Sequence, residues 1–511
     1  MDFLHELRRS FPELFDHLEE ILRHFPFVEK WFLQGPLRPL LEEESKNLLS
    51  HLKEKLKPYQ NTLPVFASLP PKGLAREEIW KLLSQMQQTE MGWQKGLASG
   101  AVYHGSPEHI ALLNEAYSLF SQVNPLHFDL WPSASKMESE IISMAAHLFT
   151  ENLSPEEKEE ICGSITSGGT ESIILAMKAY RDQAREERGI KQGEIIIPQT
   201  AHVAFEKAAH YLGLVVRKVG VDDNYRARVD EVKKAIQHST ICLVGSAPAF
   251  PHGSIDPIEE LSELAFRHGI GFHTDACLGG FILPFAKKLG YEIPAFDFSL
   301  RGVTSLSADT HKYGYAAKGT SIILYRTKKL RQYQYFTATD WPGGLYFSPT
   351  MAGSRPGGLL AACYAAMLSL GYEGYLANTQ KILHTAQKIR DGIAQIPHLK
   401  LIGNPLFIIT FTSNSPHLDI YQVLDNMSQR GYSLNGLQRP RAIHLAVTLR
   451  HCEADFVERF LHDLTEAVRQ CYGKPASEGT LAPVYGLAES LPIRGAIHQL
   501  LKTLLDAYYS T

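Results

Sequence analysis

The chain has 511 residues, of which 44% are hydrophobic and 21% charged, and its formal net charge at pH 7 is −4. This composition is typical of a soluble enzyme with one large domain and a smaller one. A slightly acidic chain gives no reason to expect nucleic acid as a partner. The six cysteines are scattered without a CxxC pair, so we expect free thiols in a reducing compartment and no metal site.

Residues 1 to about 60 carry apolar side chains at helical spacing, interrupted by prolines. Such stripes usually pack on the body of the protein or on a partner subunit, and binding to a membrane surface is the alternative. No apolar run approaches the roughly 18 residues that a membrane span needs. The first residues also lack the basic and apolar regions of a secretory signal. We therefore expect a soluble, cytoplasmic protein without a transmembrane anchor.

From about residue 135 to 370 the pattern alternates between helices and short apolar strands. The expected helices include 137–148, 203–211 and 258–267. The expected strands are 195–197, 215–219, 240–244, 270–273 and 321–325. This alternation predicts a mostly parallel sheet with helices on both faces.

The last third of the chain begins with a long expected helix, from about 359 to 396. A smaller α/β region follows, with strands at 399–402, 407–412 and 442–447 and helices at 418–430 and 453–471. A loose link at 476–479 leads to a last helix that ends near Tyr509.

Lys312 stands in the segment Ser307-Ala308-Asp309-Thr310-His311-Lys312-Tyr313-Gly314. A lysine in this setting suits the imine that pyridoxal phosphate (PLP) forms with one amine of its enzyme, an amine that later serves as acid or base. Taken alone the segment is a weak signal, because most His-Lys pairs are exposed charge.

A second segment, Ser167-Gly168-Gly169-Thr170-Glu171-Ser172, precedes a helical run at 173–180. Two glycines let backbone N–H groups approach an anion, and the N-terminus of the helix adds partial positive charge. The pattern therefore indicates a phosphate cup, and an ordinary helix cap after a glycine turn is the alternative. It matches neither a Walker A loop nor GxGxxG, which argues against a nucleotide.

Asp275 ends a largely apolar run that starts at Gly269. A carboxylate at the C-terminal end of a strand faces the ligand crevice of an open α/β sheet. There it could keep the pyridine nitrogen of PLP protonated, which makes the ring an electron sink. An aspartate that caps the next helix is the alternative.

With the cup, Asp275 and Lys312 in this order, the chain resembles the PLP-dependent group II decarboxylase family of fold type I over about residues 90 to 470. The resemblance implies an aspartate aminotransferase-like fold with a large, mostly parallel sheet domain and a small C-terminal α/β domain. We set the boundaries at 1–125 for a helical N-terminal segment, 126–375 for the large PLP-binding domain and 376–511 for the small domain. Three further segments are similar to those of the family's lyases that act on phosphorylated sphingoid bases, namely 99–103, 124–129 and 313–319.

The resemblance also implies a role for each site residue. Lys312 binds PLP, Asp275 pairs with its pyridine nitrogen, and His202 stacks on the ring. The remaining cofactor-binding residues are Gly168, Gly169, Thr170, His311, Gly353 and Ser354. The last two lie in a loop that reaches the cofactor phosphate of the neighbouring subunit in relatives, so we expect a homodimer with its site at the subunit interface.

Four residues match positions that hold the substrate phosphate, namely Tyr103, Asn124, His127 and Lys318. A phenol, an imidazole and an ammonium can together bind a dianion through charge-assisted hydrogen bonds. The implied enzyme is an aldehyde lyase that cleaves the C2–C3 bond of a phosphorylated sphingoid base to a long-chain fatty aldehyde and phosphoethanolamine. Its base is the freed Lys312 or Tyr103.

Two other functions remain open from the residues. An L-amino-acid decarboxylase on the same fold would need a cation for the α-carboxylate of its substrate, and Arg355 is the candidate. A non-catalytic scaffold is the third hypothesis, which the intact cup, Asp275 and Lys312 disfavour.

Overall fold

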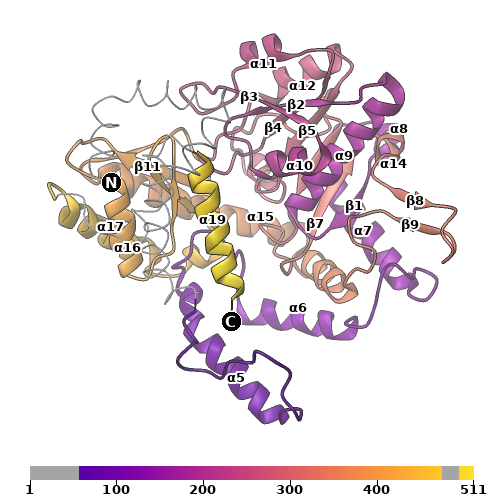
Figure 1. Cartoon of the computed structure of the whole chain (residues 1–511). Helices are drawn as coiled ribbons and strands as arrows, with labels where there is room; N and C mark the ends of the chain where they lie inside the picture. The colour runs from indigo at the N-terminus through magenta and orange to yellow at the C-terminus, as the bar shows by residue number, and fades with distance from the viewer. Residues whose placement is uncertain (1–56, 475–493, 511) are drawn as a thin grey trace. The chain divides into compact units, whose positions relative to one another are not determined.

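The computed structural model describes residues 57–474 and 494–510 (Figure 1). These form two compact units. The larger unit comprises residues 98–411 and 444–461, and the smaller one holds the other described residues. The predicted boundaries at 125/126 and 375/376 differ from this division and stay a prediction.

A seven-stranded sheet forms the centre of the larger unit, in the order β1-β7-β6-β5-β4-β2-β3. The strands from β3 to β6 pair in parallel, whereas β7 is antiparallel to both β6 and β1. Their bounds are β1 (Cys162–Thr166), β2 (Glu194–Pro198), β3 (Val215–Val219), β4 (Thr240–Ser246), β5 (Gly271–Asp275), β6 (Ser305–Ala308) and β7 (Ser321–Tyr325). The predicted mostly parallel α/β sheet is confirmed.

Helices cover both faces of this sheet, which explains why most of its strands are buried along their whole length (Figure 1). His273 of β5 meets Phe205 of α10, whereas its neighbour Phe272 lies towards Ile258 of α12 across Gly245. Successive strand residues point to opposite faces, so α10 and α12 cover opposite sides. The covering helices include α7 (Pro132–Leu148), α9 (Gly169–Arg188), α10 (Ala204–Leu212), α11 (Val229–Ala235), α12 (Ile258–Arg267) and α13 (Leu283–Lys288).

Strands β1 and β6 are not predicted from the sequence, because small polar residues stand where aliphatic residues would mark a strand. Ser164 is 4% exposed and Ser305 is fully buried. Their hydroxyls are nevertheless paired: Gln334 Nε2 donates to Ser164 Oγ, and Ser305 Oγ lies 2.6 Å from Tyr180 Oη. Buried polar side chains are tolerated where hydrogen bonds satisfy them, and such strands carry little apolar signal.

Helix α15 (Gly357–Gln395) is the long helix expected after Gly358, but it is interrupted at Gly371, which has φ 55° and ψ −175°. Within the described residues, it is the one helix long and apolar enough to cross a membrane by length and composition, with a mean hydropathy of 1.2 over 18 residues. This finding qualifies the expectation that no apolar run is long enough. A core helix passes the same test, and α15 packs against α6 (Pro107–Leu119) and α7 and buries Leu360, Cys363 and Ile382.

A second, four-stranded sheet has the order β10-β11-β13-β12. Its strands are β10 (Leu399–Leu401), β11 (Ile408–Ser413), β12 (Asn435–Leu437) and β13 (Ala442–Ala446), accompanied in the chain by α16 (Ile420–Gln429) and α17 (Phe456–Cys471). All but β12 lie where the sequence predicts them. The last expected helix is α19 (Arg494–Tyr509). The predicted helices over residues 1–56 and the link at 476–479 lie outside the described residues.

Candidate active site

A cavity of about 390 Å³ opens beside the C-terminal ends of the parallel strands of the larger unit. Its walls come from the segment before α9, the segment after β2, the end of β5 and the loop after β6. The predicted cofactor residues that line it are Gly168, Gly169, Thr170, His202, Asp275, His311 and Lys312. One chain therefore brings these residues together, as an open α/β sheet does at its strand ends.

The predicted phosphate cup lies at the start of α9, which begins at Gly169. A Cβ added to Gly169 would lie 2.7 Å from Cys277 Sγ and 2.8 Å from Asp309 Oδ1, so only glycine fits. The first N–H groups of a helix have no partner within the helix. At the edge of this cavity they are suited to a phosphate group.

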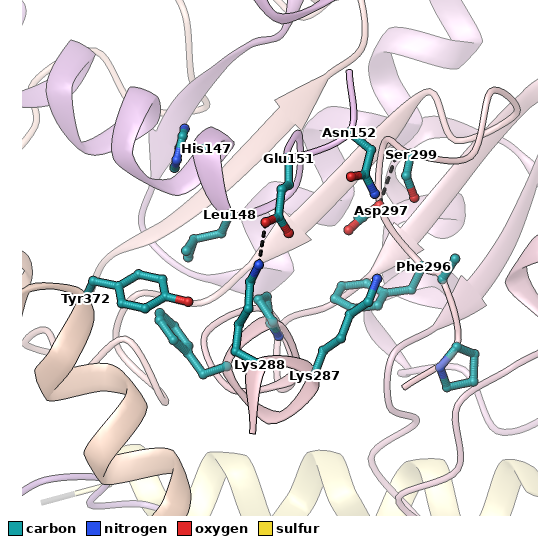
Figure 2. A pocket seen from close by; sticks show the side chains of 14 residues that line it. His147, Leu148, Glu151, Asn152, Lys287, Lys288, Phe296, Asp297, Ser299 and Tyr372 are labelled. Atoms are coloured by element: carbon teal, nitrogen blue, oxygen red, sulfur yellow. Dashed lines mark hydrogen bonds and ion pairs between the residues drawn. The ribbon is translucent and has the colours of Figure 1, made fainter. Parts of the chain in front are cut away.

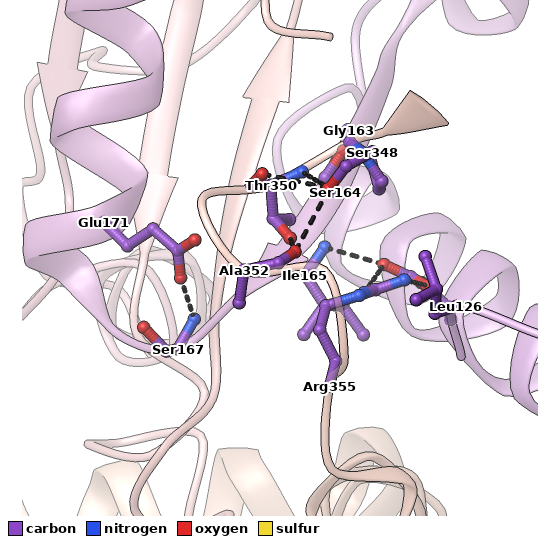
Figure 3. A network of polar contacts seen from close by, with 12 residues as sticks. Leu126, Gly163, Ser164, Ile165, Ser167, Glu171, Ser348, Thr350, Ala352 and Arg355 are labelled. Carbon is purple, nitrogen blue, oxygen red and sulfur yellow. Dashed lines mark hydrogen bonds and ion pairs between the residues drawn. The ribbon is translucent and has the colours of Figure 1, made fainter. Parts of the chain in front are cut away.

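Glu171 links this cup to another loop, a role that the sequence does not reveal. Its Oε2 accepts a hydrogen bond from Ser167 N at 2.6 Å, and its Oε1 accepts one from Met351 N at 2.9 Å. Figure 3 shows Glu171 beside Ser167, with the loop after β9 (Tyr346–Ser348) crossing nearby. The carboxylate therefore fixes the cup and that loop together.

Asp275 and His202 lie on the sheet side of the cavity. Asp275 ends β5, is 7% exposed, and accepts a hydrogen bond from Cys277 N at 3.1 Å. His202 precedes α10, and its Nδ1 accepts a hydrogen bond from Ala204 N at 3.1 Å. Since Nδ1 is an acceptor, the neutral ring carries its hydrogen on Nε2. A carboxylate and a flat imidazole in one polar cavity suit a protonated heteroaromatic ring.

Lys312 forms an ion pair with Asp309, whose Oδ2 lies 2.8 Å from Nζ. Asp309 is 2% exposed. Burial alone would lower the pKa of Lys312, but the Asp309 carboxylate outweighs it and holds that pKa above its ordinary value. The lysine is therefore an ammonium in this state. The sequence places Asp309 three residues before Lys312 but gives no sign that the two side chains meet.

The loop that follows Lys312 is fixed by hydrogen bonds from three directions. Tyr375 Oη donates to Gly314 O at 2.8 Å, Tyr313 Oη donates to Val447 O at 2.9 Å, and His109 Nε2 bonds to Tyr315 O at 2.7 Å. Tyr315 also has a φ of 60°, which non-glycine residues rarely adopt. These contacts hold the backbone of Lys312 in one place.

Tyr103 and Lys318 meet next to Lys312. Lys318 Nζ lies 4.6 Å from the centroid of the Tyr103 ring and donates to His311 O at 3.2 Å. Although Lys318 is exposed as a residue, loss of water around its ammonium and the nearby Lys312 lower its pKa to about 8. Burial raises the pKa of Tyr103 to about 12, so its phenol keeps its proton at neutral pH.

Tyr103 and Lys318 adjoin Lys312 but do not line this cavity, and neither do the four remaining predicted residues. Asn124 Nδ2 donates to Ser354 Oγ at 3.1 Å, and Gly353 adjoins Ser354 in the loop after β9. His127 is exposed, and its backbone N–H donates to Asn124 O at 3.0 Å. These residues form a group of their own on two adjacent loops.

Arg355 is not a free cation. Its Nη1 and Nη2 lie 2.8 and 3.1 Å from the two carboxylate oxygens of Glu138, and its backbone N–H donates to Asn124 Oδ1 at 3.1 Å. Both side chains of the ion pair are mostly buried, at 16% and 17% exposure. The cation that a decarboxylase would need is therefore already bound to a carboxylate.

A separate cavity of about 140 Å³ lies near the C-terminal end of α7. Figure 2 shows the ion pair between Lys288 and Glu151 inside it. It shares no lining residue with the cavity at Lys312. None of the residues predicted for a site lies there, and we do not assign it to the chemistry.

The residues present fit PLP. The glycine cradle at α9 suits its phosphate, Asp275 its pyridine nitrogen, His202 its ring and Lys312 its aldehyde carbon. No cluster of three or more His, Cys, Asp or Glu side chains suited to a metal ion occurs in the described parts of the chain.

This fold and cavity define a PLP-dependent α/β enzyme, and comparison with known proteins gives the same class. The family described as the pyridoxal-dependent decarboxylase conserved domain matches residues 98–408. The sphingosine-1-phosphate lyase of Arabidopsis thaliana is 49% identical over 422 residues, which is 82% of this chain and 76% of that protein. A solved structure of a Burkholderia pseudomallei sphingosine-1-phosphate lyase is 42% identical, with a TM-score of 0.81 over 89% of this chain and 99% of that one.

The chain belongs to the sphingosine-1-phosphate lyases of the pyridoxal-dependent decarboxylase family. Lactobacillus brevis glutamate decarboxylase is 21% identical, with a TM-score of 0.70 over 82% of this chain and 98% of that one. That likeness shows the shared fold alone. The predictions of the family, of fold type I and of PLP as the cofactor are confirmed.

Proposed function

We propose that this protein cleaves the C2–C3 bond of phosphorylated sphingoid bases such as sphingosine 1-phosphate, giving a long-chain fatty aldehyde and phosphoethanolamine. One observation carries the proposal. Lys318 and Tyr103 meet beside Lys312, and neither is part of the cup at α9. The site therefore offers donors for a second phosphate, which a lyase acting on a phosphorylated substrate needs and an amino-acid decarboxylase does not.

When bound, PLP supplies an electron sink for the charge left on C2 as the bond to C3 breaks. The chain's own residues orient the reactants. The N-terminus of α9 binds the cofactor phosphate, Asp275 holds a proton at the ring nitrogen and His202 covers the ring. Lys318 and Tyr103 hold the substrate phosphate, which fixes the C2–C3 bond relative to the ring.

The proton on the C3 hydroxyl needs a base, and the two predicted candidates both hold protons in this structure. Asp309 keeps Lys312 as an ammonium, and burial keeps Tyr103 a phenol. Either group has to give up its proton before it can act as a base. The choice between Lys312 and Tyr103 stays open.

We also propose a homodimer in which Gly353 and Ser354 reach the neighbour's cofactor phosphate and Asn124 and His127 complete the neighbour's substrate site. None of these four residues lines the cavity of its own chain, which supports this arrangement. A cytoplasmic location is proposed as well, because the six cysteines are free and suit a reducing compartment.

The test is a product assay with PLP-loaded protein. Sphingosine 1-phosphate, unphosphorylated sphingosine and a panel of L-amino acids are incubated separately, and aldehyde, phosphoethanolamine and carbon dioxide are measured. We expect aldehyde and phosphoethanolamine in equal amounts from the phosphorylated base, and none with Lys312→Ala. Carbon dioxide from an amino acid, without aldehyde from any sphingoid base, would overturn the proposal in favour of a decarboxylase.

A further inference from the structure

Asp309 occupies an unusual position between Lys312 and the phosphate cup. Its Oδ2 lies 2.8 Å from Lys312 Nζ, while its Oδ1 is buried and has no close hydrogen-bond partner. The Ser321 hydroxyl contributes less than Lys312 to lowering the pKa of this carboxyl. The same carboxylate borders the start of α9, since a Cβ on Gly169 would lie 2.8 and 2.9 Å from its two oxygens. A buried carboxylate with one unused oxygen is costly unless a charge nearby offsets it.

The groups around this pair supply few other charges. His311 Nε2 is 4.0 Å from Asp309 Oδ2, and burial lowers the pKa of that imidazole. Cys277, which follows β5, and Tyr103, which precedes α6, face the pair with pKa values raised by burial, so both are neutral. Lys318 is the other nearby amine, and it bonds to a backbone carbonyl, His311 O. Lys312 is therefore the main counter-charge of Asp309.

We propose that Asp309 is the positioning residue of Lys312: its carboxylate holds Nζ at the cavity wall and keeps a proton on that nitrogen. The inference concerns the site described above but holds whichever substrate is cleaved. It assigns Asp309 an electrostatic role that is separate from holding the loop in shape. The loop has its own supports, since Tyr375 and His109 hydrogen-bond to Gly314 and Tyr315.

An ammonium does not react with acylating reagents, whereas an amine does, so the reactivity of Lys312 measures the effect of Asp309. The Asp309→Asn variant keeps the shape of the side chain and removes its charge. In the cofactor-free full chain, a brief pulse of succinic anhydride at several pH values is followed by mass spectrometry of the lysine-containing peptides. We expect labelling of Lys312 at a given pH to rise by about tenfold or more, since one pKa unit is a tenfold change in the amine fraction.

The chain offers a reference lysine on α9. Lys178 Nζ lies 3.1 Å from Asp182 Oδ2, and Lys178 is 22% exposed, close to the 23% of Lys312. Lys178 Nζ also donates to Tyr333 O and Tyr335 O, so it serves as an internal reference. Asp309→Asn should raise the labelling of Lys312 and leave that of Lys178 unchanged, and Asp182→Asn should leave that of Lys312 unchanged. Unchanged labelling of Lys312 in Asp309→Asn would overturn the proposal. No substrate is used, so a failure here is distinct from a failure of the proposed cleavage reaction.

The PLP-loaded protein gives a second readout that does not depend on turnover. If Asp309 keeps a proton on the nitrogen of Lys312 when it is bonded to the cofactor, the pH at which the visible absorption band changes should fall in Asp309→Asn. The expected shift is one pH unit or more. A midpoint equal to that of the unaltered protein would contradict the proposal.

A double-mutant cycle separates charge from loop structure even if Asp309→Asn lowers stability. In the otherwise unaltered protein the change leaves an unpaired ammonium, so the urea midpoint should fall. With Lys312→Met in place, Asp309 is itself the unpaired buried charge, and the same change should raise the midpoint. An equal loss of stability in both backgrounds would show that Asp309 only supports the loop and would overturn the proposal.

Discussion

The two halves of the predicted site behave differently within one chain. Gly169, Asp275 and Lys312 meet in one cavity, whereas Asn124 and Ser354 bond to each other outside it. The first group follows strands of a single sheet, and the pairing of those strands brings the residues together. The second group lies on two loops that no strand of that sheet places at the cavity. A parallel sheet therefore completes the cofactor half, and a second copy of the chain is needed in our proposal for the other half.

Among the changes to the cofactor half, Lys312→Ala should cause the largest loss of activity. Without Nζ the chain cannot bond to PLP, so we expect loss of the visible absorption band and turnover at the background level. The measurements are the absorption spectrum, product release and a peptide map after borohydride reduction. Lys178→Ala, on α9, is the control. If the map places the pyridoxyl group on Lys318 or any other lysine, the assignment is wrong.

Asp275→Asn should leave PLP bound and slow the reaction by several orders of magnitude. An amide cannot hold a proton on the pyridine nitrogen as a carboxylate does, which weakens the electron sink at the step that breaks the bond. The amount of bound cofactor and kcat are measured together. A near-normal kcat with full cofactor content would mean that Asp275 has only a structural role, as the acceptor of the hydrogen bond from Cys277 N.

The other half of the comparison is tested by mixing two inactive variants. Ser354→Asp places a carboxylate where the neighbour's cofactor phosphate is expected, so repulsion should abolish activity in the pure variant. Mixed with Lys312→Ala, each heterodimer has one site without either change, and random pairing in a two-fold dimer restores about a quarter of the full activity. The measurement is activity after unfolding and refolding the mixture.

Two outcomes of that mixing experiment would count against a shared site. Full activity of pure Ser354→Asp would mean that this loop does not approach a cofactor phosphate. Loss of activity in the variant without recovery on mixing would mean that Ser354 acts in its own chain. The control is the same mixing with Asp275→Asn in place of Ser354→Asp. Each chain then carries a change in its own cofactor half, so neither site of a heterodimer is intact and mixing should restore no activity.

The sequence reveals those parts of this protein that rest on local patterns. The strands rich in aliphatic residues, the cup before α9 and the aspartate at the end of β5 all lie where they are predicted, because periodicity and strand ends are local features. The pairs Lys312–Asp309 and Arg355–Glu138 escape prediction for another reason. Each depends on side-chain direction, and Glu138 is far from Arg355 along the chain.

Strand β6 shows a further limit. Its two serines, Ser305 and Ser307, can be buried because His273 bonds to both hydroxyls and Tyr180 bonds to that of Ser305. Only the folded sheet assembles this network. The break of α15 at Gly371 is of the same kind, since a glycine inside an apolar helical pattern has no fixed meaning until its neighbours are in place.

Lys318→Ala should lower kcat/KM for the phosphorylated substrate selectively. A charge-assisted contact of this kind contributes about 1.5–3 kcal/mol, or a loss of roughly ten- to a hundredfold in kcat/KM. The unphosphorylated base should react slowly with both proteins and show little further loss. The comparison of kcat/KM for the two substrates is the measurement. Equal losses would mean that Lys318 does not bind phosphate.

The pH dependence of the contact between Lys318 and the substrate phosphate should be the smallest effect. The direction in which kcat/KM changes with pH follows from the lowered pKa of Lys318. With a pKa of about 8, Lys318 is a cation below pH 8 and loses its charge as the pH rises past that value. Binding of a phosphate dianion should therefore weaken above pH 8, with kcat/KM falling by up to about tenfold per pH unit. Tyr103, with a pKa of about 12, does not titrate in this range. Because arginine stays charged, Lys318→Arg should lack the decline near pH 8, and a profile that keeps it would assign the decline to another group.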